Sequence, residues 1–103
     1  MQYQLVLRFR REALKTAEDI GAVERALVES LAGSAQLDGH DSSPRFIDVF
    51  VLTADPGSTF RRSKPALEKL QLLERVVAAH RLEGGARFTV LWPLKYGRKF
   101  SLD

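Results

Sequence analysis

The sequence predicts an α+β fold in which an antiparallel sheet with the element order β-α-β-β-α-β is backed by two helices. A segment of alternating polarity, residues 2–10, is followed by a segment of helical periodicity, residues 16–32. The same order recurs downstream, with alternation over residues 45–53 and a helical pattern from Pro56 to about Leu73. Because 103 residues suffice for one hydrophobic core, residues 1–103 are expected to form a single α+β domain.

The first strand and helix each have one apolar side. Side chains alternate across a strand, so one face of residues 2–10 is predicted to be buried, and that face consists of Tyr3, Leu5, Leu7 and Phe9. The helix has an apolar stripe with spacings of three and four, formed by Ile20, Val23, Leu27 and Leu31. Gly33 follows at the place where a left-handed residue often ends a helix.

The middle of the chain predicts a hairpin whose second strand is central. Ala35 to Asp41 is a weak strand candidate, and residues 41–44 supply turn chemistry. Arg45 to Thr53 is the strongest strand, and both of its sides are apolar. One side carries Ile47, Val49 and Val51, and the other carries Phe46, Phe50 and Leu52 together with Asp48. A strand with two apolar sides is usually covered on both.

The second half begins with a helix that Asp55 is expected to cap, with Pro56 at its first position. Pro65 predicts a kink inside this helix. Residues 76–81 fit either a continued helix or a strand; the Gly84-Gly85 pair that follows favours a hairpin, and hence a fifth strand near residues 75–82. Residues 87–92 are predicted as the last strand, with Phe88, Val90 and Trp92 expected to face the helices. A polar tail of about residues 95–103, which contains Tyr96 and Phe100, is expected to follow.

Composition limits the classes of protein. The net charge of +3 indicates solubility rather than nucleic-acid affinity, and the absence of cysteine excludes disulfides and cysteine metal sites. No apolar run approaches the roughly 20 residues that span a membrane, and the first residues alternate too strictly for a secretory signal. We therefore expect a cytoplasmic protein with no membrane partner and no cofactor.

Four short strings resemble a family of small, uncharacterised bacterial proteins of about 100 residues. They are residues 38–41 (DGHD), 53–56 (TADP), 64–69 (KPALEK) and 89–93 (TVLWP), so the resemblance spans nearly the whole chain. The resemblance implies a ferredoxin-like α+β fold. It implies no catalytic residues, and the fold itself hosts many unrelated functions.

Three residues are weighed as acid-base or ligand groups: Asp38, His40 and His80. In a regular strand Asp38 and His40 point the same way, and Asp48 would approach them across the hairpin, which suits a divalent metal or a proton relay. The alternative is that residues 38–41 serve the turn and that His40 is solvated. Without a third histidine or a cysteine we favour this alternative, with no metal site, and we interpret His80 as a residue at the edge of the core.

Basic clusters occur at residues 8–11, 61–64 and 95–99, and the first and last of them include an aromatic residue. Such clusters bind phosphates and stack bases in nucleic-acid-binding proteins, some of which share this β-α-β-β-α-β order. However, the strand at residues 45–50 lacks the glycines of the RNA-binding signature and carries Asp48 beside its aromatic rings. We interpret the basic clusters as solvated surface.

The leading prediction for function is a non-enzymatic binding module. Two helices cover one side of the sheet, so the other side is expected to expose an apolar patch of Val6, Phe46, Phe50, Leu52 and Leu91. Sheet-to-sheet packing of a homodimer would cover this patch, which would otherwise hold a protein or a small apolar ligand. The alternatives are a companion protein such as an immunity protein, a cofactor-free enzyme using His40 or His80 in a dimer cleft, and a nucleic-acid-binding module.

Overall fold

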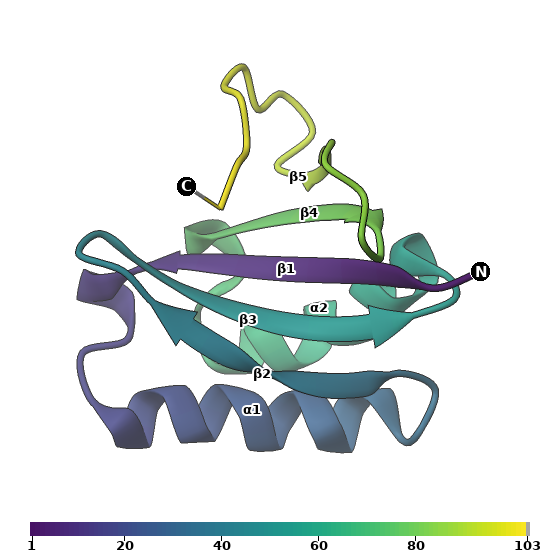
Figure 1. Ribbon diagram of the computed structural model, residues 1–103. Coiled ribbons are helices and arrows are strands. Elements are labelled where there is room, and N and C mark those ends of the chain that lie inside the picture. Colours follow the sequence, from purple (N-terminus) through teal and green to yellow (C-terminus); the bar gives the residue numbers. More distant parts are fainter. Residues whose placement is uncertain (103) are drawn as a thin grey trace.

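The computed structural model describes residues 1–102 and contains one antiparallel sheet with two α-helices (Figure 1). The elements in chain order are β1 (Tyr3–Arg10), η1 (Arg11–Ala13), α1 (Ala17–Leu31), β2 (Gln36–Ser42), β3 (Phe46–Thr53), α2 (Pro56–Lys69), η2 (Leu73–Arg75), β4 (Val76–Leu82) and β5 (Thr89–Trp92). The five strands lie in the order β2-β3-β1-β4-β5. This is a ferredoxin-like α+β fold with one strand added at the β4 edge.

Local sequence signals set the two helices. Thr16 caps α1, because its hydroxyl accepts a hydrogen bond from Asp19 N and the Asp19 carboxylate accepts one from Thr16 N. Asp55 caps α2 as predicted, accepting from Ser58 N at 3.0 Å. The helix α2 continues through Pro65, which is exposed to solvent. It ends at Lys69, before the predicted Leu73, because Gln71 has a left-handed conformation with φ of 60°.

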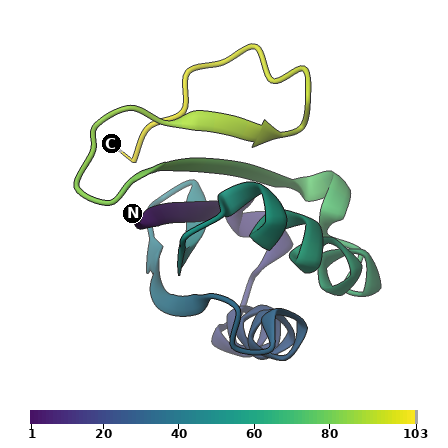
Figure 2. The same cartoon turned by 90° about the vertical axis from the view of Figure 1, so that its right-hand side faces the viewer.

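Both helices pack on one side of the sheet, as the edge-on view shows (Figure 2). The strands β1, β3 and β4 give this side its buried centre, since Leu7 pairs with Val49 and with Ala78. The predicted stripe of α1 packs onto it: Ile20, Val23, Leu27 and Leu31 all belong to the same core. We call this the helix side of the sheet and its opposite the open side.

The region after α2 forms a strand, so the favoured interpretation of residues 75–82 is confirmed. The connection to β5 is longer than a two-residue turn: it covers residues 83–88, and the last strand begins at Thr89 rather than at Arg87. The pairing of β4 with β5 shifts between Ala78 and Ala79, where Trp92 and then Val90 lie opposite. This irregularity breaks the strict alternation on which the sequence analysis relied.

As a result, three residues of the last strand region lie on sides other than those predicted. Leu91 packs against the helix-side core together with Trp92. Phe88 and Val90, which were expected beside the helices, pack instead on the open side. One register shift therefore exchanges the two sides over this short segment.

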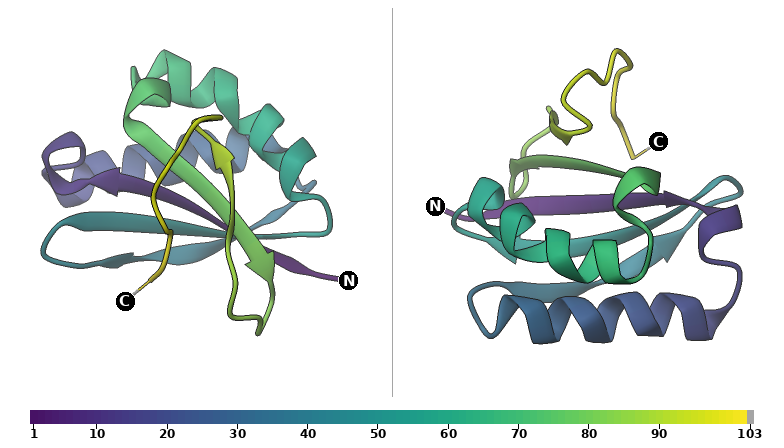
Figure 3. Two further views of the ribbon diagram at one scale, coloured as in Figure 1. Left: turned by 90° about the horizontal axis from the view of Figure 1, so that it is seen from above. Right: turned by 180° about the vertical axis from the view of Figure 1, so that it is seen from behind.

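The chain after β5 does not leave the molecule as a polar tail. It loops outward and returns across β4 and β1 on the open side (Figure 3). Phe100 is only 5% exposed and packs against Val6 and Ala79, both of which are fully buried. The predicted tail is polar apart from Tyr96 and Phe100, and Phe100 finds an apolar partner on the sheet.

Candidate functional site

The open side of the sheet carries the most distinctive arrangement of side chains in the molecule. Its apolar centre is a small core of Val6, Ala79 and Phe100, with Phe50, Val77, Phe88 and Val90 partly buried around it. Charged residues at both ends of this core make close contacts with its aromatic rings. The side predicted to be an open patch is thus a second, partly shielded core.

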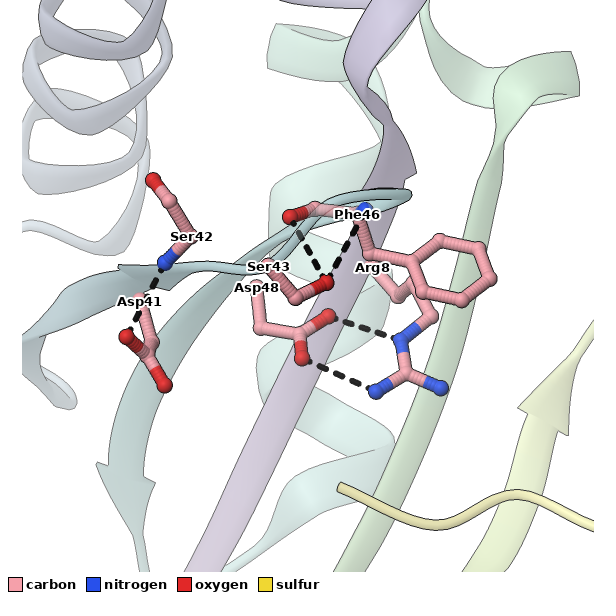
Figure 4. Close-up of polar contacts among 6 residues, drawn as sticks. All are labelled: Arg8, Asp41, Ser42, Ser43, Phe46 and Asp48. Atoms are coloured by element: carbon pink, nitrogen blue, oxygen red, sulfur yellow. Dashed lines mark hydrogen bonds and ion pairs between the residues drawn. The ribbon is translucent and has the colours of Figure 1, made fainter. Parts of the chain in front are cut away.

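Arg8 and Asp48 form a bidentate ion pair across β1 and β3 (Figure 4). Arg8 Nε lies 2.8 Å from Asp48 Oδ1, and the second guanidinium bond, from Nη2 to Oδ2, is 2.9 Å long. The two side chains are only 11% and 10% exposed, so the pair is largely removed from water. The two residues are direct neighbours in the β1–β3 register, which fixes them on the same side.

The Arg8 guanidinium is also enclosed by two aromatic rings. Its central carbon lies 4.4 Å from the ring centre of Phe46 and 4.2 Å from that of Phe100. Contacts of this kind are attractive because the face of an aromatic ring is electronegative. Arg8 therefore connects the fixed sheet, through Asp48 and Phe46, with the returning C-terminal segment.

Phe100 is the principal anchor of that segment. Its ring meets Phe88 in a T-shaped contact with centres 5.0 Å apart. We call the recess formed by Val6, Arg8, Ala79 and Phe88 the Phe100 socket. Within residues 1–102, residues 94–102 form no hydrogen bond with the sheet, and Leu94 and Leu102 are 86% and 37% exposed. The segment is held chiefly by one side chain.

A second arginine supports the socket from β4. Arg81 Nε donates a hydrogen bond of 2.9 Å to Gln4 Oε1, and the guanidinium lies 4.7 Å from the ring centre of Phe88. Gln4 and Arg81 are register neighbours on the open side. The contact with Arg81 positions the Phe88 ring beside the socket, although Phe88 lies in the loop before β5.

The five residues predicted to form the interaction patch have different environments. Val6 is completely buried by the chain itself, and Leu91 lies on the helix side, so neither is part of an exposed patch. Phe46, Phe50 and Leu52 are on the open side, since they pair with Arg10, Val6 and Gln4, and each is half-buried. The continuous exposed patch expected from the sequence is therefore not present in one chain.

The cluster of Asp38, His40 and Asp48 that the sequence analysis weighed against a solvated His40 is separated by the sheet. A bulge between Leu37 and His40 breaks the alternation, so His40 pairs with Val49 and lies on the helix side. Its Nδ1 is 3.1 Å from Glu24 Oε2 on α1. Asp48 faces Arg8 on the open side, and Asp38 is exposed. The arrangement of Asp38, His40 and Asp48 that would suit a metal or proton relay does not form.

Asp41 does not join Asp48 to form a cluster of carboxylates either (Figure 4). It is the register neighbour of Asp48, yet its Oδ1 accepts a hydrogen bond from Ser42 N and its side chain points away from Arg8. Among residues 1–102 no group of three or more histidine, aspartate or glutamate side chains is placed to hold a metal ion.

His80 lies at the opposite end of the sheet from the Arg8–Asp48 pair. It pairs with Leu5, on the helix side, and meets Tyr3 in an edge-on contact with ring centres 5.8 Å apart. Its Nδ1 is buried without a hydrogen-bond partner. Burial lowers the pKa of His80 below its ordinary value of 6.5, because the charged ring would lose hydration. The imidazole is therefore neutral at pH 7.

Comparison of the chain with models of protein families, with curated proteins and with solved structures finds no match. None of the helices in residues 1–102 is both long enough and apolar enough to cross a membrane.

Sequence reasoning missed Phe100, Arg8 and Phe88 as members of this site. A signal for Phe100 was available, because a large aromatic residue between charged and small residues is seldom left in water without a contact. Arg8 and Asp48 offered a weaker one: opposite charges on neighbouring central strands tend to pair across the sheet. The side chosen by Phe88 depends on the β4–β5 register shift, which has no clear signature in the sequence.

Proposed function

We propose that the protein is a non-enzymatic interaction module that binds a partner polypeptide through the Phe100 socket. The partner would insert an aromatic side chain between Arg8 and Phe88, over Val6 and Ala79. The chain's own C-terminal segment would then be an intramolecular competitor that covers the site until the partner arrives.

The observation that supports this proposal is the way in which Phe100 is held. A built recess with apolar, aromatic and cationic walls surrounds one ring, while residues 94–102, which carry the ring, make no hydrogen bond to the sheet in the described part of the chain. Binding surfaces often concentrate their energy in such aromatic anchors and pair them with arginine. The arrangement resembles an anchor and its pocket more than an ordinary packed terminus.

The energetics permit exchange. Burying one phenylalanine contributes about 2–3 kcal/mol, and the contacts with Arg8 and Phe88 add about 1 kcal/mol. An untethered segment with these contacts alone would bind with a Kd of about 1 mM. Tethering gives an effective concentration in the millimolar range, so the closed form is favoured only modestly. A partner that adds a few contacts beyond the socket would displace Phe100.

The homodimer expected from the sequence depended on an uncovered apolar patch. Because the same chain already buries Val6, a dimer of two open sides would first have to displace two Phe100 rings. Two copies could also exchange their C-terminal segments, but each Phe100 would then make the same contacts as before. The exchanged dimer would gain no contact energy and would lose the translational and rotational entropy of two separate molecules. The proposal therefore expects a monomer at micromolar concentration.

The test uses a synthetic peptide of residues 94–102 and the full-length Phe100→Ala variant, whose socket is empty. In methyl NMR spectra the peptide should shift Val6 and Ala79 with a Kd of about 1 mM. A peptide carrying the Phe100→Ala change should leave both signals unmoved. Wild-type protein should respond about tenfold more weakly, since its socket is occupied in the closed form. Equal shifts by both peptides, or equal responses of the two proteins, would reject the socket.

A further inference from the structure

A second recess lies at the other end of the sheet, where β4 runs past the start of β5. It has a volume of about 360 Å³ and is bounded by the start of β1, the end of β4 and the loop before β5. The side chains that matter here are those of Tyr3, His80, Leu82, Arg87 and Thr89. His80 and the Phe100 socket lie on opposite sides of the sheet, because His80 pairs with Leu5 and Ala79 pairs with Val6. We call this second recess the His80 cavity.

The orientation of His80 determines which nitrogen is available. Within residues 1–102, Nδ1 is the single buried side-chain nitrogen or oxygen without a partner. His80 Nε2 also forms no hydrogen bond within these residues and is not among their buried unpartnered atoms, so it has contact with solvent, and His80 lines the cavity. An orphaned buried N–H is rarer in proteins than an unsatisfied acceptor, which places the proton of the neutral ring on Nε2. The cavity therefore contains a neutral N–H donor.

The other polar groups of the cavity are also donors. Arg87 is exposed and forms no ion pair or hydrogen bond within residues 1–102, and Thr89 contributes a hydroxyl. Arg81 lies at the rim, but its Nε already donates to Gln4. Among residues 1–102, no aspartate or glutamate lines the cavity. A site with cationic and neutral donors and no carboxylate favours an anion, and a free guanidinium binds a carboxylate through two parallel bonds.

The apolar walls define the rest of the ligand. The Tyr3 and His80 rings stand nearly perpendicular, with an angle of 75° between their planes, and Leu82 closes a further side. Flat rings fit well against such edge and face surfaces. We propose that the His80 cavity binds a small aromatic carboxylate, with the carboxylate on Arg87 and His80 Nε2 and the ring between Tyr3 and Leu82. This site is independent of the proposed role of the Phe100 socket.

Benzoate is a suitable probe, and the chain supplies its own control because it has two histidines. Adding benzoate should shift the His80 ring signals in NMR spectra with a Kd in the millimolar range, as expected for about nine non-hydrogen atoms. It should also raise the measured pKa of His80, since a bound anion favours the imidazolium. The signals of His40, which contacts Glu24 on α1, should not move.

Variants and analogues separate this proposal from general anion binding. Arg87→Gln should weaken benzoate binding about tenfold, whereas Arg98→Gln, at an exposed position of the C-terminal segment, should leave it unchanged. Benzamide, a neutral analogue, should not shift His80, and inorganic phosphate should compete poorly because it lacks a ring. Equal effects of benzamide or phosphate, parallel movement of His40, or no movement of His80 well above millimolar benzoate would overturn the proposal.

Discussion

Replacing Phe100 with alanine should destabilise the protein and release the C-terminal segment from the sheet. The ring is 5% exposed, so nearly all of its surface returns to water when the segment opens. Burial of a phenylalanine contributes about 2–3 kcal/mol, and loss of the Arg8 and Phe88 contacts costs about a further 1 kcal/mol. The released segment regains conformational entropy, which offsets part of this cost. Because the closed form is favoured only about tenfold over the open form, we expect a net loss of about 1 kcal/mol.

Thermal unfolding followed by circular dichroism measures this loss. For a domain of this size, a change of about 1 kcal/mol lowers Tm by about 4–8 °C. Leu102→Ala is the matched control, because Leu102 lies in the same segment but is 37% exposed and should change stability by less than about 0.5 kcal/mol. If Phe100→Ala and Leu102→Ala shift Tm equally, Phe100 is not the anchor and the proposed socket has no energetic basis.

Three further predictions concern the ion pair, His80 and self-association. Asp48→Ala should lower the free energy of unfolding by about 3 kcal/mol, because it leaves the Arg8 guanidinium buried without its partner; the double variant Arg8→Met with Asp48→Leu should cost clearly less in urea denaturation, and equal costs would contradict the desolvation argument. The lowered pKa of His80 means that the unfolded chain binds more protons just below pH 6.5, so stability should fall as the pH decreases from 6.5 to the folded pKa and then level off with respect to this residue. His80→Phe should remove this part of the dependence of the free energy of unfolding on pH. An unchanged pH dependence would show that another group causes it. In sedimentation, wild type should be a monomer at micromolar concentration and Phe100→Ala should associate more readily; a wild-type dimer that Phe50→Asp dissociates would instead support the sheet-to-sheet interface.

Much of the fold was predictable because its signals are local. Asp55 and Pro56 mark the start of α2, the stripe from Ile20 to Leu31 orients α1, and the two apolar sides of Arg45 to Thr53 identify a central strand. The two apolar sides of this strand also implied that its open side, away from the helices, would be covered. The nature of the cover was not predicted: it is supplied by Phe100 of the same chain rather than by another molecule.

The parts that failed depend on register and long-range pairing. The β2 bulge next to Gly39 moves His40 to the helix side, and the β4–β5 shift exchanges the positions of Val90 and Leu91. A displacement of one residue reverses every later side chain of a strand, so small irregularities defeat alternation arguments. The Arg8–Asp48 pair required knowledge that β1 and β3 are neighbours with these residues opposite each other.

The central claim is that a single chain covers the open side of its own sheet with Phe100. Nuclear Overhauser contacts between the Phe100 ring and the methyl groups of Val6 and Ala79 test it most directly, in protein shown to be monomeric under the same conditions. We expect these contacts in spectra of uniformly labelled protein. They should be absent from isotope-filtered spectra that detect only contacts between different molecules. Random-coil chemical shifts for Phe100, or contacts that appear only between differently labelled molecules, would contradict it.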